Sequence, residues 1–171
     1  MDKYAFLMIK YKTPQLFKDI QDELSEDDVY YNEDENSHTE FGIEKDTHVT
    51  IAACLDNDTD VDELKKYLKP LEEYKAFITN ISTFNCPNYD VLKSDVASIP
   101  LFNTNEKIKE NHELHTEHKE YHPHATIAYL KHGIAEKYTK EILDKLVVLE
   151  PEYFWYTYYD KYGNSQKITW K

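Results

Sequence analysis

Two of the eight histidines head matching tetrapeptides: His48 begins HVTI and His124 begins HATI. Thr50 and Thr126 each stand two residues further on, and side chains two residues apart project from the same face of a β-strand. Two imidazoles can divide the work of general base and general acid near neutral pH, and threonine hydroxyls can donate hydrogen bonds to phosphate oxygens. The sequence therefore predicts metal-independent phosphoryl-transfer chemistry at these four residues. It does not say which histidine is the acid.

Both tetrapeptides lie in short apolar segments, 47–55 (THVTIAACL) and 124–130 (HATIAYL), which predict buried strands. Periodicity and turn residues predict the other elements: strands at 4–12, 74–85, 90–96, 153–159 and 166–170, and helices at 13–24, from Thr59 or Asp60, at 101–121 and at 135–146. The similar strands stand at corresponding places in this order. We therefore expect an α+β fold over residues 1–171, a single domain with two pseudo-symmetric lobes. The polar faces of the two motif strands could line a central cleft between the lobes.

The composition limits the partners. The formal net charge of −13 disfavours long nucleic acids, because binding a phosphate backbone depends on lysine and arginine displacing counterions. The chain contains no arginine, so any phosphate must be held by other groups. Cys54 and Cys86 lack the spacing of a zinc or redox motif, and no apolar run is long enough to span a membrane. We expect a cytoplasmic protein that does not bind membranes.

Two other segments contain residues that could bind a metal ion. A predicted helix carries histidines at spacings that could gather zinc or nickel ligands, namely His112, His115, His118 and His122. The intervening glutamates and lysines favour an ordinary exposed helix instead. The acidic run 56–63 resembles the start of a calcium loop, but Val61 stands where the glycine belongs. The sequence therefore predicts neither a metal nor another cofactor.

The paired motifs HVTI and HATI resemble those of the two-histidine phosphoesterase superfamily. Within it, the segments FGIEKDTHVTI and YHPHATIAYL are similar to those of the bacteriophage anti-CBASS cyclic-nucleotide nucleases. The resemblance implies a fold in which each lobe is an antiparallel sheet flanked by helices. It also implies hydrolysis of a 3′-5′ bond in a cyclic di- or trinucleotide and suppression of host CBASS defence. One histidine would activate the ribose 2′-OH, the other would protonate the departing 5′-oxygen, and a 2′,3′-cyclic phosphate would form first.

A cyclic nucleotide also needs contacts for its bases. Tyr11 and Trp155 are candidates for stacking, and Glu152 is a candidate for binding a base edge. Two alternatives remain open. The same motifs would serve a 2′,3′-cyclic phosphodiesterase or RNA-end-processing enzyme that acts on linear nucleotides, and a non-catalytic protein could sequester a cyclic nucleotide without turnover.

Overall fold

The computed structural model describes residues 3–31, 41–141 and 146–171. Its helices are α1 (Gln15–Glu23), α2 (Val61–Lys65) and α3 (Ile99–Asn111), with 3-10 turns at Glu26–Asp28, Leu71–Tyr74 and Ala135–Tyr138. Its strands are β1 (Ala5–Tyr11), β2 (His48–Leu55), β3 (Ala76–Asn85), β4 (Tyr89–Ala97), β5 (His124–Lys131), β6 (Lys140–Glu141), β7 (Val147–Leu149), β8 (Pro151–Tyr159) and β9 (Ser165–Trp170). The predicted α+β class is confirmed.

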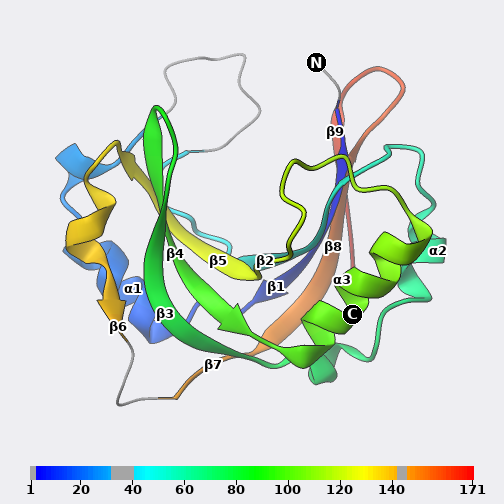
Figure 1. Ribbon diagram of the computed structural model, residues 1–171, viewed down its shortest axis with the longest axis horizontal. Helices are drawn as coiled ribbons and strands as arrows, with labels where there is room; N and C mark the ends of the chain where they lie inside the picture. Colours follow the sequence, from blue (N-terminus) through cyan, green and yellow to red (C-terminus); the bar gives the residue numbers. More distant parts are fainter. Residues whose placement is uncertain (1–2, 32–40, 142–145) are drawn as a thin grey trace.

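All the described strands belong to one antiparallel sheet, in the order β6-β3-β4-β5-β2-β1-β8-β9, with β7 also paired to β3. The expectation of two separate sheets is therefore corrected to one continuous sheet. The two motif strands are neighbours, and their registered contact is Val49 opposite Ala125. Figure 1 shows that the sheet is strongly curved. In this view α1 lies at the left, next to β3 and β4, and α2 and α3 lie at the right, next to β8.

The two motif strands contribute matching residues to the core. Val49 and Ile51 of β2 are fully buried, and so are Ala125 and Ile127 of β5. In each strand the residue after the isoleucine is buried too, so the alternation of buried and exposed positions shifts there. The cause is a shift in strand register. The pairing of β2 with β1 and the pairing of β5 with β4 each shift by one residue at the isoleucine. Both strands thus carry a β-bulge at the same position of the motif.

The predicted helix at 101–121 is shorter than expected. Helix α3 begins earlier, because the Ser98 hydroxyl accepts a hydrogen bond from the backbone N–H of Leu101 and caps the first turn. It ends at Asn111, soon after Ile108, the last residue that the helix buries. The N–H of His115 instead donates to the carbonyl of Cys54 at the end of β2. Leu114 and Tyr121, which follow the helix, still pack against the core, but they do so from non-helical backbone.

The predicted helix at 135–146 is wrong over the residues that the structure describes. A 3-10 turn at Ala135–Tyr138 is followed by β6, which pairs with β3. The Asp90 carboxylate accepts hydrogen bonds from the backbone N–H groups of Gly133 and Ala135, which holds this turn. Residues 142–145 lie outside the described part of the chain. Residues 140–141 pair with β3, so their backbone N–H and C=O groups are not available for helical hydrogen bonds.

Candidate active site

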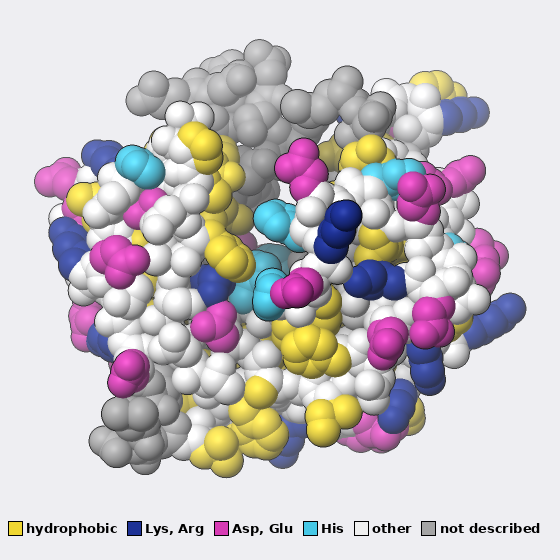
Figure 2. Space-filling model, in the orientation of Figure 1, with side chains coloured by type: hydrophobic (Ala, Val, Ile, Leu, Met, Phe, Trp, Pro, Cys, Tyr) yellow, Lys and Arg dark blue, Asp and Glu magenta, His cyan; other side chains and the backbone are white. Residues whose placement is uncertain are grey.

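The structure brings the four predicted catalytic residues together. On either side of the contact between Val49 and Ala125, antiparallel geometry places His48 across from Thr126 and Thr50 across from His124. All four side chains are half-buried. Figure 2 shows histidine side chains gathered where the viewed face is hollowed. Two other pockets lie away from these residues, one beside β3 and β6 and one beside the hairpin of β8 and β9.

Both histidines are oriented by the same kind of hydrogen bond. His48 Nδ1 lies 2.7 Å from the carbonyl oxygen of Asp46, and His124 Nδ1 lies 2.8 Å from the carbonyl oxygen of His122. A carbonyl oxygen can only accept, so each Nδ1 carries the hydrogen. The neutral form of each ring is then the tautomer whose Nε2 has a free lone pair, and each Nε2 is available to a substrate. The sequence showed the two histidines but not this shared orientation.

A side-chain amide from a helix supports each motif strand at its bulge. Asn105 of α3 donates its Nδ2–H to the carbonyl of Ile51 at 2.8 Å, and Gln21 of α1 donates its Nε2–H to the carbonyl of Ile127 at 3.1 Å. A bulge interrupts the ladder of strand hydrogen bonds, and a buried carbonyl without a donor is costly. The carbonyl of Ile127 also accepts a 3.0 Å hydrogen bond from the backbone N–H of Glu44, so Gln21 is a second donor to it. Asn105 supplies a side-chain donor to the carbonyl of Ile51 at the equivalent position.

We expect Asn105→Ala to lower the free energy of unfolding by about 1–3 kcal/mol, because it leaves the buried carbonyl of Ile51 without its donor. Urea denaturation measures the change. Asn103→Ala is the matched control: it makes the same substitution in the same helix at an exposed position. Equal stabilities of the two variants would show that the amide does not support the bulge.

The predicted base contacts Trp155 and Glu152 lie on the His48 side of the site. The Trp155 ring is in contact with the His48 ring, with centroids 4.8 Å apart and planes tilted by 40°. Lys167 Nζ lies 3.9 Å from the centroid of the Trp155 ring. Glu152 accepts a hydrogen bond from Lys10 at 3.3 Å, and Lys10 is paired with His48 across β1 and β2. Trp155 thus adjoins a candidate catalytic ring directly, whereas Glu152 reaches the site through Lys10.

The third predicted base contact, Tyr11, is placed differently. Tyr11 has 0% of its surface exposed, and its hydroxyl donates a 2.7 Å hydrogen bond to the carbonyl of Tyr74. Burial raises the pKa of its hydroxyl. A nucleotide base could stack on this ring only if the core opened, so the prediction that Tyr11 contacts a base is wrong. The sequence could not show this, because Tyr11 ends an apolar strand whose inner face was unknown.

His124 has a different set of neighbours. The edge of the Phe84 ring meets the His124 ring, with centroids 4.9 Å apart. On β4, Asp95 is paired with His124 and Lys93 is paired with Thr126. Burial lowers the pKa of His124, and the charges of Lys93 and His48 lower it further, whereas the hydrogen bond to His122 and the charge of Asp95 act in the opposite direction.

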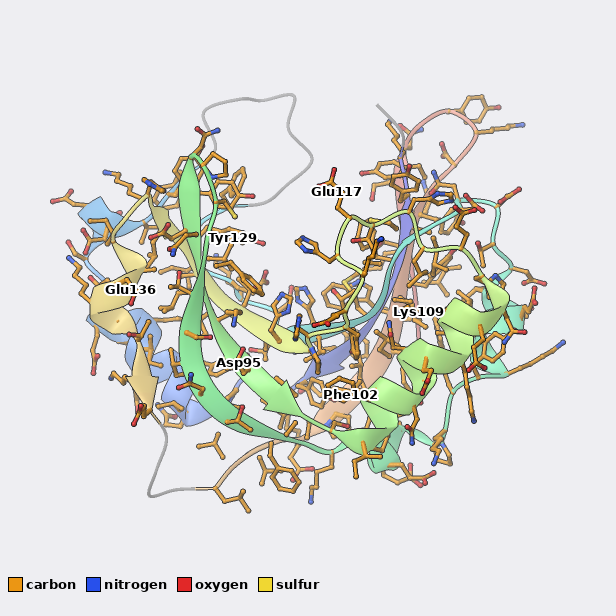
Figure 3. All side chains as sticks on the ribbon, in the orientation of Figure 1. Asp95, Phe102, Lys109, Glu117, Tyr129 and Glu136 are labelled. Carbon is orange, nitrogen blue, oxygen red and sulfur yellow. The ribbon has the colours of Figure 1, made fainter. Side chains whose placement is uncertain are left out.

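Sequence reasoning missed the three neighbours of His124, namely Phe84, Lys93 and Asp95. The alternation of the predicted strand at 90–96 places Lys93 and Asp95 on one face, which was the available signal. Finding their partners required knowing that β4 pairs with β5. Asp95, labelled in Figure 3, extends from β4.

The histidine-rich segment does not form a metal-binding helix. It follows the end of α3, and Glu117 of this segment is labelled in Figure 3. His115 Nε2 lies 2.8 Å from Asp56 Oδ1, and the ring of His115 stacks on Tyr4. Within residues 3–31, 41–141 and 146–171, no group of three or more potential ligands is arranged to hold a metal ion. Over the same ranges, no helix is long and apolar enough to span a bilayer.

No protein-family model matches the chain, and no curated protein matches its sequence.

Proposed function

We propose that the protein is a metal-independent phosphodiesterase that hydrolyses 3′-5′ bonds of cyclic di- or trinucleotides, with His48 and His124 as the acid-base pair. The observation that carries this proposal is the shared orientation of the two rings: each Nδ1 is held by the carbonyl two residues earlier, at 2.7 and 2.8 Å. Two imidazoles that each offer Nε2, with a threonine across from each, suit in-line proton transfer at one phosphate.

The reaction uses these groups in the following order. One Nε2 accepts the proton of the ribose 2′-OH as this oxygen attacks phosphorus. The other imidazole, in its protonated form, gives its proton to the 5′-oxygen as the bond between phosphorus and that oxygen breaks. The products of this first step are a 2′,3′-cyclic phosphate and a free 5′-OH. In a second step water attacks phosphorus and gives its proton to the imidazole that is now neutral, while the imidazole that is now protonated gives its proton to the departing 2′-oxygen, so the net reaction is hydrolysis. Thr50 and Thr126 donate hydrogen bonds to the non-bridging oxygens, where negative charge develops.

The proposal includes two pseudo-symmetric halves around a central cleft. Three matched features support it: the HVTI and HATI strands, the bulge at Ile51 and at Ile127, and the amide that each bulged carbonyl receives. The two halves would meet at the contact between Val49 and Ala125. A phosphate bound at this axis would meet one histidine and one threonine from each half.

Aromatic rings beside both histidines support a nucleotide substrate. Phe84, which adjoins His124, is exposed and could stack on a base. Trp155, which adjoins His48, is buried with Lys167 over its ring, so a base could stack on it only if Lys167 moved. Glu152 is the candidate for a base edge, in competition with its bond to Lys10. The net charge of −13 favours a small nucleotide over a polymer. Destroying such signals in the bacterial cytoplasm would block CBASS antiphage defence.

We expect the purified protein to cleave cyclic di- or trinucleotides in EDTA, because the proposed chemistry uses no metal. The test offers cyclic dinucleotides, cyclic trinucleotides, 2′,3′-cyclic mononucleotides and short RNA, with chromatography of the products. Cleavage of linear substrates alone would show an enzyme that processes RNA ends or 2′,3′-cyclic phosphates. Tight binding of a cyclic nucleotide without turnover would show a sequestering protein.

A further inference from the structure

Lys93 is an almost fully buried lysine held in a small polar cluster on β3 and β4. Its Nζ donates hydrogen bonds of 2.6 Å to Ser82 Oγ and 2.6 Å to Asp95 Oδ1. Ser82 Oγ in turn donates to Asp95 Oδ2 at 3.0 Å. The side chain of Lys93 is 6% exposed and that of Asp95 is 41% exposed. A buried ammonium with two short bonds keeps a fixed position, unlike a surface lysine.

This cluster borders the candidate active site. Lys93 is paired with Thr126, and Asp95 with His124, so all four side chains project from the same face of the sheet. Lys93 Nζ also lies 4.3 Å from the centroid of the Phe84 ring, and the edge of that ring meets His124. Lys93 therefore stands opposite Thr126 in the sheet, its Nζ is held by Ser82 and Asp95, and its charge acts on His124.

Two other lysines near the site are held differently. Lys10 Nζ donates to the backbone carbonyl of Tyr11 and to Glu152, so its charge is directed to groups outside the histidine pair. Lys167 is exposed, and its Nζ lies over the ring of Trp155. Lys93 is the buried lysine whose carboxylate partner itself faces a candidate catalytic histidine.

We propose that Lys93 is the phosphate-binding cation of this site, held beside Thr126 by Asp95 and Ser82, in a chain without arginine. This proposal rests on the proposed function and adds a residue to it. An ammonium has three N–H donors, and Ser82 and Asp95 take two of them. The third is available to a non-bridging phosphate oxygen. A charged hydrogen bond at that oxygen stabilises its negative charge, as a metal ion or a guanidinium group does in other phosphate sites.

The same charge acts on His124. The charged and titratable groups that face His124 are Lys93 and Asp95 from β4 and His48 from β2, while Phe84 from β3 is uncharged. Burial is the main cause that lowers the pKa of His124, and Lys93 adds to it. A fixed cation at this position favours neutral His124, which is the form that a general base requires. His48 is then the acid.

The test uses inorganic phosphate and the full-length protein, followed by the NMR signals of the histidine rings at pH 7. Wild-type protein should show saturable shifts of the His124 signals. Lys93→Met should raise the dissociation constant of phosphate about tenfold or more, while Lys93→Arg, which keeps the charge, should bind more tightly than the methionine variant. The pKa of His124 should rise in Lys93→Met, because a neighbouring cation has been removed.

Lys75→Met is the matched control, since it removes a lysine paired with Glu150 at the surface. If Lys93→Met fails to fold, Lys93→Met with Asp95→Asn replaces it, because the double variant leaves no unpaired carboxylate. Equal phosphate binding by the Lys93 and Lys75 variants, or no response of wild-type His124 to phosphate, would overturn the role of Lys93. Absence of nucleotide cleavage by wild-type protein would overturn the phosphodiesterase and leave the phosphate result standing.

Discussion

Replacing either His48 or His124 with alanine is expected to reduce kcat/KM for phosphodiester cleavage by about 10²–10⁴-fold, the usual contribution of a positioned acid or base. Both rings are held through Nδ1 by a backbone carbonyl, so the reactive nitrogen of each is Nε2. Alanine removes that nitrogen and leaves the strand intact. Because the two groups act on one phosphate in one step, the double variant should lose much less than the product of the two single losses.

The measurement is the initial rate on whichever nucleotide the wild-type protein cleaves, in EDTA. His132→Ala is the matched control, because His132 Nδ1 also lies near a backbone carbonyl, that of Cys86 at 2.9 Å, but its ring is exposed and outside the site. We expect the control to retain wild-type activity. Full activity in both the His48 and the His124 variants would exclude the proposed mechanism, whatever the substrate.

Thr50→Val and Thr126→Val are each expected to lower kcat by about 10²–10³-fold, the loss typical of removing one hydrogen-bond donor to developing negative charge. Valine keeps the β-branched shape that suits a strand, so the hydroxyl is the group removed. The effect should fall on kcat more than on KM, because the charge on the non-bridging oxygens grows in the transition state.

Steady-state kinetics of the valine variants beside Thr50→Ser and Thr126→Ser tests this role. Serine keeps the hydroxyl and should restore most of the activity. A serine variant as impaired as its valine counterpart would mean that the methyl group, and so packing, matters more than the hydrogen bond. Unchanged kcat in both valine variants would remove the threonines from the mechanism.

Local sequence patterns predicted the strands that carry the motifs, because alternation and β-branched residues report directly on a half-buried strand. They failed where local propensity competes with distant contacts. The segment 101–121 has helical composition, yet α3 ends at Asn111, where its buried face ends. The segment after Ala135 was predicted as a helix, but β3 lies beside it and pairs with β6. Neither outcome can be predicted from residues that are close in the sequence.

The sequence by itself determined that two His-x-Thr-Ile segments are strands with a polar and an apolar face, because that alternation is a property of the strand alone. Only the tertiary structure decided the neighbours of each histidine, since strand register and order depend on contacts between residues far apart in the chain. Those contacts place Trp155 beside His48, place Lys93 and Asp95 beside Thr126 and His124, and bury Tyr11 in the core.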